Sequence, residues 1–440
     1  MFSGGRSSAS GAALANGVAA HILEFDDIHK TSTVHAAAPV ISAALAVAER
    51  EHVDGRAFLL AVTLGYEAAL RIGEAVNPSH YRYWHPTGTA ATFGAAAAAG
   101  SLIHLSPAQM LDALGSAGTQ AAGLWEFNAD GAMSKHLHPG KAAFNGILAA
   151  DLARMGFTGA TRILEGERGF FRAMSASYDE SRVTDGLGER WKIAENCYKL
   201  YSCCGHTHTA IDVALDLAAQ LQSEAHSSDS FQPHSSDLLW GGPPGPRRAP
   251  WPGFTSLHQS AGQGAVSGPG GPPYILIETY GPGYQIVKEP APRTPYQAKF
   301  SIAYCVAVAL LDGRVGLDQF SPDRLHDPAI AALLEHTRVV VAEDLTAKYP
   351  AAWPTRVTLT LPDGATLTGS SDYPRGNPEN PVSTAQLEDK FRSLVTPPVT
   401  ARFSAATAER AIEAVQSLET CEDIFTVFRD LVHERHQPPR

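Results

Sequence analysis

Residues 57–76 read AFLLAVTLGYEAALRIGEAV, and their apolar side chains recur at every third or fourth position. This spacing places those side chains on one face of an α-helix. The same pattern returns in four further stretches, ALANGVAAHILEF (13–25), VISAALAVAERE (40–51), PAQMLDALGSAGTQAAGL (107–124) and AAFNGILAADLARMG (142–156). We therefore predict that the chain up to about residue 220 forms a bundle of helices.

Local signals indicate where some of these helices begin and end. Ser106 before Pro107 is typical of a helix start, and Gly156 stands where a C′ glycine would end a helix. The Ala-rich stretch FGAAAAAGSLI (93–103) predicts a buried helix, because small side chains let neighbouring helices approach closely.

The second half of the chain carries mixed patterns. YILIETYGPGYQIV (274–287) alternates like two strands around a Gly-Pro-Gly turn, and HTRVVVAED (336–344) is typical of a buried strand. RVTLTLPDGATLTGS (356–370) predicts a hairpin with Asp363-Gly364 at its bend. AKFSIAYCVAVALLDG (298–313) and TAERAIEAVQSLETCEDIFTVFRDLV (407–432) predict helices.

These patterns predict a mainly α fold with two domains. We expect a large all-helical domain from residues 1–194 and 393–440, and a smaller α+β lid domain from residues 195–392. Residues 226–273 fit neither domain, because their 48 positions hold 9 Gly, 9 Pro and 8 Ser without apolar periodicity. Such a segment predicts a disordered insertion. A sequence error or retained non-coding stretch is the alternative, since order resumes abruptly at Tyr274.

Composition excludes several classes of partner. The net charge is −11 with no basic tail, which argues against nucleic acid. No apolar run reaches about 18 residues, so we expect no membrane span. The first residues, MFSGGRSSASG, lack the apolar core of a signal peptide, and five Cys form no disulfide framework. We expect a cytoplasmic protein with reduced thiols.

Common catalytic motifs are absent from the sequence. It contains no GxGxxG after a strand, no Walker loop, no HExxH, no CxxC and no GxSxG. His206, His208 and Cys203 match no common zinc spacing, so we predict no metal site.

Histidine and lysine instead gather beside turns and helix ends in five segments. These are HILEFDDIHKTSTVHAAAP (21–39), YRYWHPTGTAATFG (81–94), DGAMSKHLHPGKAAFNG (130–146), NCYKLYSCCGHTHTAID (196–212) and TPYQAKFSIAYCVAVALLDG (294–313). Any one of these histidines, taken alone, is more often a core or surface residue. Their repetition in an acidic protein indicates a site for an anionic substrate, and the Thr/Gly turn at Thr87 opens a helix that would attract a carboxylate.

The segments together resemble the MmgE/PrpD family. In chain order, the blocks that carry the resemblance are FDD followed by His, WHPTGTAATFGAAAAA, GTQAAGL, GAMSKHLHPGKAAFNG, GFTG, YKLYSCCGHTHTAID, FSIAYCVAVALLDG and SDYPRGNPENPVSTAQLEDKF. The resemblance implies a helical domain with an α+β lid, a homodimer, and no metal or organic cofactor. The active-site positions that it implies are Asp27 or its neighbours, His35, His85, Lys135, Lys199 and Tyr304.

Two features depart from the family pattern. Family members usually begin with some tens of helical residues before the FDD block, so we expect the first helices to be absent here. Decarboxylase-like members carry a His five residues after the lysine that corresponds to Lys199, whereas this chain has Cys204 there. His206 and His208 follow, and we include both among the residues that bind substrate.

We interpret the chain as a cofactor-free lyase that moves a proton on a small polycarboxylate. Lys135, Lys199 and His85 are expected to hold carboxylates, while His35 or His138 transfers the proton. Tyr304 would hold a carboxylate or give a proton. A dehydratase of the 2-methylcitrate type ranks first. The alternatives are a cis-aconitate-type decarboxylase, an iminodisuccinate-type epimerase, and an inactive homologue or defective gene product that only binds the ligand.

Overall fold

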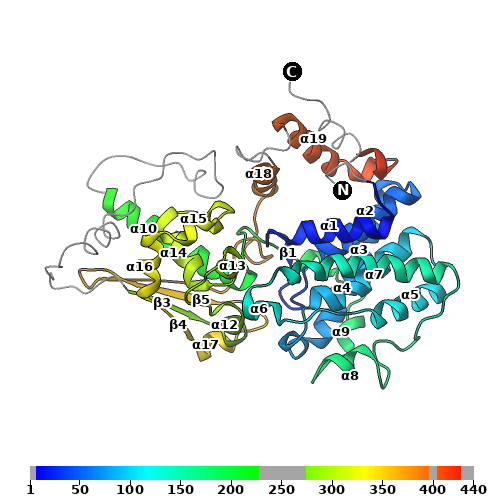
Figure 1. The fold of residues 1–440 in the computed structure, drawn as a ribbon, viewed down its shortest axis with the longest axis horizontal. Helices are drawn as coiled ribbons and strands as arrows, with labels where there is room; N and C mark the ends of the chain where they lie inside the picture. The colour runs from blue at the N-terminus through cyan, green and yellow to red at the C-terminus, as the bar shows by residue number, and fades with distance from the viewer. Residues whose placement is uncertain (1–5, 227–273, 396–403, 428–440) are drawn as a thin grey trace. The chain divides into compact units, whose positions relative to one another are not determined.

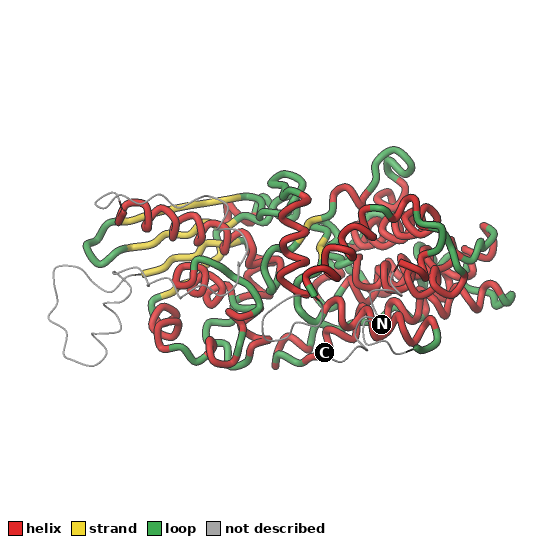
Figure 2. The backbone as a smooth tube through the Cα atoms, turned by 90° about the horizontal axis from the view of Figure 1, so that it is seen from above, coloured by secondary structure: helices red, strands yellow, loops and turns green. Residues whose placement is uncertain are grey.

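The structure, a computed structural model, describes residues 6–226, 274–395 and 404–427. The insertion predicted at 226–273 lies outside the described residues except for its first position. The chain divides into two compact units, Met1–Tyr198 with Leu394–Arg440, and Lys199–Ser393. The prediction of a mainly α protein is confirmed (Figures 1 and 2). Among the described residues, no helix is both long and apolar enough to cross a membrane.

The first unit is a group of packed helices. Its longer helices are α1 (Ala9–His21), α2 (Ala37–Glu51), α3 (Gly55–Val76), α4 (Pro86–Leu102), α5 (Pro107–Thr119) and α7 (Leu137–Arg154). Its short helices are η1 (His80–Arg82), α6 (Phe127–Asp130), η2 (Met133–His136), α8 (Phe170–Met174), α9 (Ser181–Thr184), η3 (Lys192–Glu195), α19 (Ala405–Gln416) and η6 (Leu418–Thr420). Helix α4 packs against α2, α3, α5 and α7 (Figure 1). Nearly all its side chains are buried.

The predicted helix ends are confirmed. Ser106 caps α5 in a capping box with Gln109, and Gly156 follows α7 with a positive φ of 86°. Small residues let α3 and α4 cross closely: a Cβ on Gly94 would lie 2.5 Å from the carbonyl oxygen of Gly65. The Ala- and Gly-rich composition therefore serves close helix packing, as the sequence predicted.

One feature of this unit is not helical. Strands β1 (Asp27–Ile28) and β2 (Cys197–Tyr198) pair antiparallel, with Asp27 opposite Tyr198. This ladder corrects the expectation that the chain up to about residue 220 forms only helices. Each strand has two residues, which is too short for an alternating pattern to be visible in the sequence.

The second unit combines a four-stranded sheet with helices. Strands β3 (Tyr274–Thr279), β4 (Thr337–Val341), β5 (Thr355–Thr360) and β6 (Thr366–Ser371) lie in the order β4-β3-β5-β6. Strand β3 is parallel to β4 and antiparallel to β5. Strands β5 and β6 form the predicted hairpin, with Gly364 at φ +86° in its bend.

This unit has a second apolar core, to which its helices and strands contribute. Figure 2 shows its helices beside the strands. The helices are η4 (Gly205–Thr207), α10 (His208–His226), α12 (Gly281–Val287), α13 (Pro295–Lys299), α14 (Ile302–Asp312), η5 (Asp318–Phe320), α15 (Pro322–Leu325), α16 (Pro328–Glu335), α17 (Glu343–Thr346) and α18 (Thr384–Val395). Helices α10 and α14 contact the sheet and each other. Helix α14 is the apolar helix that the sequence predicted.

The predicted strand pair at 274–287 is half wrong. Its first part is β3, but GPGYQIV forms the helix α12, with Tyr280 as its N-cap residue. Pro282 lies in the first turn of α12, where a missing N–H costs no hydrogen bond and the fixed φ suits a helix. A Gly-Pro-Gly sequence is thus compatible with a helix start as well as with a turn.

Candidate active site

Five histidine rings of the first unit converge although they come from distant segments. They are His21 at the end of α1, His35 before α2, His85 before α4, His136 in η2 and His138 in the first turn of α7. The ring centroid of His21 lies 4.8 Å from that of His35, 5.8 Å from His85 and 5.9 Å from His136. The centroids of His85 and His138 are 5.3 Å apart. The expectation placed His35, His85 and His138 in one site, and the structure brings these three together.

His85 lies at the start of α4, where Pro86 begins the helix. Its Nδ1 is 3.1 Å from Nδ1 of His138, so one ring donates a hydrogen bond and the other accepts it. Burial, followed by the charge of Lys135, lowers the pKa of His85 well below its ordinary value. Burial likewise lowers the pKa of His138 from 6.5 to about 4. Near neutral pH this pair is therefore uncharged.

His35 is held by two neighbours that the sequence analysis named separately. Its Nδ1 lies 2.6 Å from the backbone carbonyl oxygen of Asp27, to which it donates a hydrogen bond. Its backbone N–H donates to Thr87 Oγ1 at 3.0 Å. Thr87, expected to bind substrate, is buried in the first turn of α4 and fixes the backbone of His35.

Asp27 has protein donors on its carboxylate. The carboxylate accepts hydrogen bonds from the Ala37 N–H at the start of α2, from Tyr66 Oη at 2.8 Å and from Asn196 Nδ2 at 2.8 Å. Helix α2 has no side-chain cap of its own, so Asp27 supplies the anion at its N-terminus. Burial, followed by the charge of Asp26, raises the pKa of Asp27 from 3.8 to about 6. The carboxylate of Asp27 thus holds the start of α2, and its contact with substrate stays a prediction.

Lys135 is buried and donates a hydrogen bond from Nζ to Oε1 of Glu24, which is itself fully buried. Lys135 belongs to η2, next to His136, and Glu24 lies in the loop after α1. A buried lysine and glutamate stabilise each other's charge, because neither could easily remain charged alone. The ammonium of Lys135 is thus placed beside the histidine cluster.

His21 completes the cluster and was missed by the sequence analysis. Its Nδ1 lies 2.6 Å from Oδ2 of Asp26, and the same carboxylate oxygen lies 3.5 Å from Nδ1 of His35. Among the described residues, Nε2 of His21 has no hydrogen-bond partner and is buried. In the sequence His21 looked like part of an apolar helix face, and its only signal was the acidic loop that follows it.

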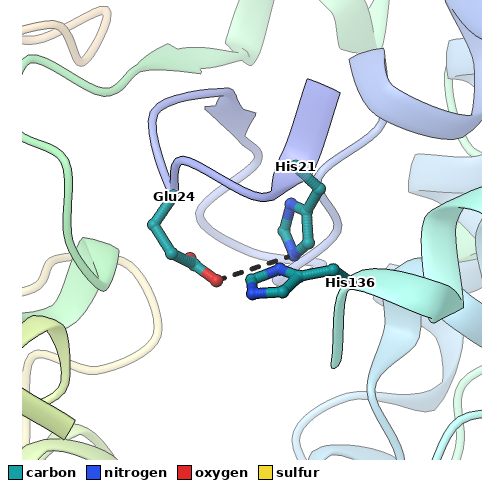
Figure 3. A group of neighbouring side chains, drawn as sticks. All are labelled: His21, Glu24 and His136. Carbon is teal, nitrogen blue, oxygen red and sulfur yellow. Dashed lines mark ion pairs between the residues drawn. The ribbon is translucent and has the colours of Figure 1, made fainter. Parts of the chain in front are cut away.

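Three groups of side chains have ligand atoms close enough for a metal ion: His21, Glu24 and His136; His21, Asp26 and His35; and His29, Glu74 and Glu195. Figure 3 shows the first, with Glu24 and His136 facing His21. Lys135 donates to Glu24 in that group, and Lys192 Nζ lies 3.1 Å from Glu74 and 3.0 Å from Glu195 in the third. The carboxylates of Glu24, Glu74 and Glu195 thus already contact lysine ammonium groups.

Four expected site residues belong to the second unit. Lys199 is 1% exposed, and its backbone carbonyl oxygen accepts a hydrogen bond from Nζ of Lys390 in α18 at 2.7 Å. Nδ1 of His206, in η4, is 2.5 Å from the hydroxyl oxygen of Tyr280. The ring centroid of His206 is 4.4 Å from that of Trp353. Lys199 and His206 are buried in this unit.

His208 and Tyr304 pack in the second core. The ring of His208, at the start of α10, lies 5.0 Å from that of Tyr201. The hydroxyl of Tyr304 donates to the carbonyl oxygen of Gln319 at 2.7 Å. Burial raises the pKa of Tyr304, so its phenol stays protonated and its proton serves this hydrogen bond. Tyr304 thus packs in the second core, and its contact with substrate stays a prediction.

The five histidines of the first unit thus form a buried cluster of ionisable rings, and the ammonium of Lys135 lies beside it. Models of the MmgE/PrpD N-terminal domain and of the MmgE/PrpD C-terminal domain match residues 1–182 and 273–420. The chain therefore belongs to the MmgE/PrpD family, as the sequence blocks indicated.

Several curated proteins are similar along most of the chain. The cis-aconitate decarboxylase-like protein oryM of Aspergillus oryzae is 27% identical over 94% of this chain and 80% of its own length. A cis-aconitate decarboxylase of Aspergillus terreus is 29% identical over 87% of this chain and 74% of its own length. The cis-aconitate decarboxylase of Homo sapiens is 29% identical over 94% of this chain and 77% of its own length. The prediction of an enzyme of the lyase class is confirmed.

Proposed function

We propose that the protein is a carboxy-lyase that removes CO2 from cis-aconitate or a closely similar unsaturated polycarboxylate. The observation that carries this proposal is the similarity to proteins named cis-aconitate decarboxylases, which extends over most of the chain. It favours the decarboxylase over the 2-methylcitrate-type dehydratase that the sequence analysis ranked first. A cytoplasmic homodimer stays a prediction.

The chemistry of such a substrate sets the demands on the site. In cis-aconitate one carboxylate sits on a CH2 group next to the double bond. When CO2 leaves, the electron pair of the broken C–C bond forms a new double bond, and the pair of the old double bond takes up a proton at the far carbon. The enzyme must therefore hold the remaining carboxylates and deliver one proton.

The cluster offers groups for both tasks. Lys135 supplies a buried positive charge for a carboxylate. One N–H of the uncharged His85–His138 pair is used in the contact between their Nδ1 atoms, so one of the two rings can donate a hydrogen bond from Nε2 to a second carboxylate. Because the pKa values of these two rings are lowered, they carry no extra proton near neutral pH. The predicted transfer of a proton by His138 is thus disfavoured for this reaction. The lysine at 199 stays a predicted clamp on the basis of the family resemblance.

Proton NMR of the purified protein with cis-aconitate, 2-methylcitrate, citrate and iminodisuccinate in D2O tests the proposal. We expect loss of cis-aconitate, release of CO2 and a product with one deuterium at the carbon that was protonated. Conversion of 2-methylcitrate alone would establish the dehydratase, and deuterium exchange into iminodisuccinate the epimerase. No change in any substrate would favour an inactive homologue.

Variants then connect the reaction to the site. Replacing Lys135 or Lys199 with Ala should abolish CO2 release. His52→Asn is a suitable control, because His52 is 62% exposed and its Nδ1 contacts Asp423 on the surface at 2.9 Å. Full activity of the Lys135→Ala variant would contradict the proposed use of the cluster.

A further inference from the structure

His21 is the part of the cluster that neither the family blocks nor the sequence analysis assigned a role. It is the last residue of α1 and is 0% exposed. Three imidazole rings surround it within 6 Å between centroids, those of His35, His85 and His136. A purely packing role would leave a polar nitrogen in an apolar environment, whereas here the neighbours of the ring are the acid–base groups of the site.

The two nitrogens of His21 have different surroundings. Nδ1 lies 2.6 Å from Oδ2 of Asp26, and a carboxylate accepts a hydrogen bond from that nitrogen in either charge state of the ring. The proton that can come and go is therefore the one on Nε2. This is the arrangement in which a carboxylate orients an imidazole for acid–base work.

Nε2 of His21 is buried without a hydrogen-bond partner among the described residues. The carboxylate oxygen Oε1 of Glu24 is 3.9 Å away, which is within ion-pair distance of a protonated ring (Figure 3) but too far for a hydrogen bond. A buried polar atom without a hydrogen bond is uncommon in folded proteins and calls for an explanation. A ligand that contacts Nε2 during turnover provides one.

A metal ion is the competing explanation for this atom, because His21, Glu24 and His136 could ligate one (Figure 3). The ammonium of Lys135 already donates to Oε1 of Glu24, the oxygen nearest to Nε2. A cation bound there would have to displace the ammonium or lie beside it, and like charges at that separation repel strongly. An organic acid faces no such repulsion and would be attracted by Lys135.

We propose that His21 is the catalytic acid, which delivers a proton from Nε2 to the substrate carbon while Asp26 holds its Nδ1. This inference rests on the proposed decarboxylase function. In the step, the C–C bond to the leaving carboxylate breaks and its electron pair forms the new double bond. The pair of the old double bond takes the proton from Nε2. The ring is left neutral and regains a proton from water before the next turnover.

His21→Asn tests the proposal, because an asparagine amide can still donate to Asp26 in place of Nδ1 but has nothing in place of Nε2. The matched control is His52→Asn, which makes the same change in the exposed His52–Asp423 pair. Initial rates of CO2 release from cis-aconitate give kcat and KM, and circular dichroism checks folding. We expect His21→Asn to lose about 100-fold or more in kcat with little change in KM, as for a lost general acid. The control should keep wild-type values.

Chemical rescue separates a catalytic role from a positioning one. In His21→Ala, which opens space for a small ring, added imidazole should restore part of kcat in proportion to its concentration. Wild-type kcat in His21→Asn, a rise in KM at unchanged kcat, or a loss in both folded variants without rescue overturns the proposal. A wild-type protein that releases no CO2 overturns the proposed function itself, so the two failures are distinguishable.

Discussion

The Nδ1 atoms of His85 and His138 face each other at 3.1 Å, so the two rings share a single proton between them at this contact. Burial lowers the pKa of both rings, that of His138 from 6.5 to about 4. We therefore expect the ring of His138 to stay neutral from pH 8 to pH 5. Its nitrogen-15 chemical shifts, assigned by comparison with His138→Gln, should be constant over this range. A transition of the His138 signals near pH 6.5 would contradict the lowered pKa.

The same shifts predict how stability depends on pH. The pKa values of His80 and His138 fall from 6.5 in an unperturbed chain to about 4 in the folded protein. Between these values the unfolded chain binds protons that the folded protein does not, so the free energy of unfolding falls as pH drops from 6.5 to 4. The lowered pKa of His85 acts in the same direction. Asp27 acts in the opposite direction, because its pKa rises from 3.8 to about 6, so it offsets part of the loss of stability that the histidines cause.

Urea denaturation at pH 7, 6 and 5 checks this balance. In the wild type we expect a lower midpoint at pH 5 than at pH 7. Removing one of these histidines with His138→Gln should weaken the dependence by up to about 1.4 kcal/mol per pH unit, the value for one proton. An equal or steeper dependence in the variant would show that other groups dominate.

The helices of the first unit were predictable because their apolar residues follow the helical period and their caps are local. Ser106 and Gly156 act within one turn of chain, so the sequence contains all that determines them. Strand β1 and the helix α12 were not predictable in this way. Strand β1 forms only because Tyr198, far along the chain, pairs with Asp27. Whether Pro282 starts a helix or a turn depends on the residues around it in the folded protein.

In the candidate site too, some residues could be predicted from the sequence and others only from the folded structure. His35, His85 and Lys135 lie in segments where His and Lys recur beside turns, and the family resemblance implied these three positions as site residues. His21 and His136 were not predicted as site residues, because their place in the cluster depends on the approach of α1 to η2 and α7, and no local pattern encodes that distance. Tyr304 was named from the resemblance, and only the position of the Gln319 carbonyl reveals where its hydroxyl points.

Tyr304→Phe distinguishes the packing role from the predicted catalytic one. The variant keeps the ring in the core and removes the hydrogen bond to Gln319. We expect a loss of about 1–3 kcal/mol in stability from the buried carbonyl left without this donor, with kcat within about twofold of the wild type. The measurement pairs thermal unfolding with the CO2 assay. A large loss of kcat at unchanged stability would restore Tyr304 to the reaction.

Gly65→Ala should destabilise the first unit. A Cβ at this position would lie 2.5 Å from a side-chain carbon of Val40 and 2.9 Å from the carbonyl oxygen of Gly94, so helices must move apart. Overpacking of this kind costs typically about 1–3 kcal/mol. Gly316→Ala is the control, because its nearest contact would be the end of the Gln319 side chain at 3.5 Å. Equal melting temperatures for the two variants would contradict the close crossing of α3 and α4.

The buried pair of Lys135 and Glu24 permits a test that separates stability from activity. Lys135→Met leaves the carboxylate of Glu24 buried without its cation, which costs roughly 3–5 kcal/mol. Adding Glu24→Gln removes that charge, so the double variant should recover most of the stability. Activity should stay lost in both, because neither can offer the ammonium to a substrate carboxylate. Denaturation midpoints and CO2 release are measured on the same preparations. If the double variant regained activity together with stability, Lys135 would be a structural residue and the carboxylate clamp would lie elsewhere.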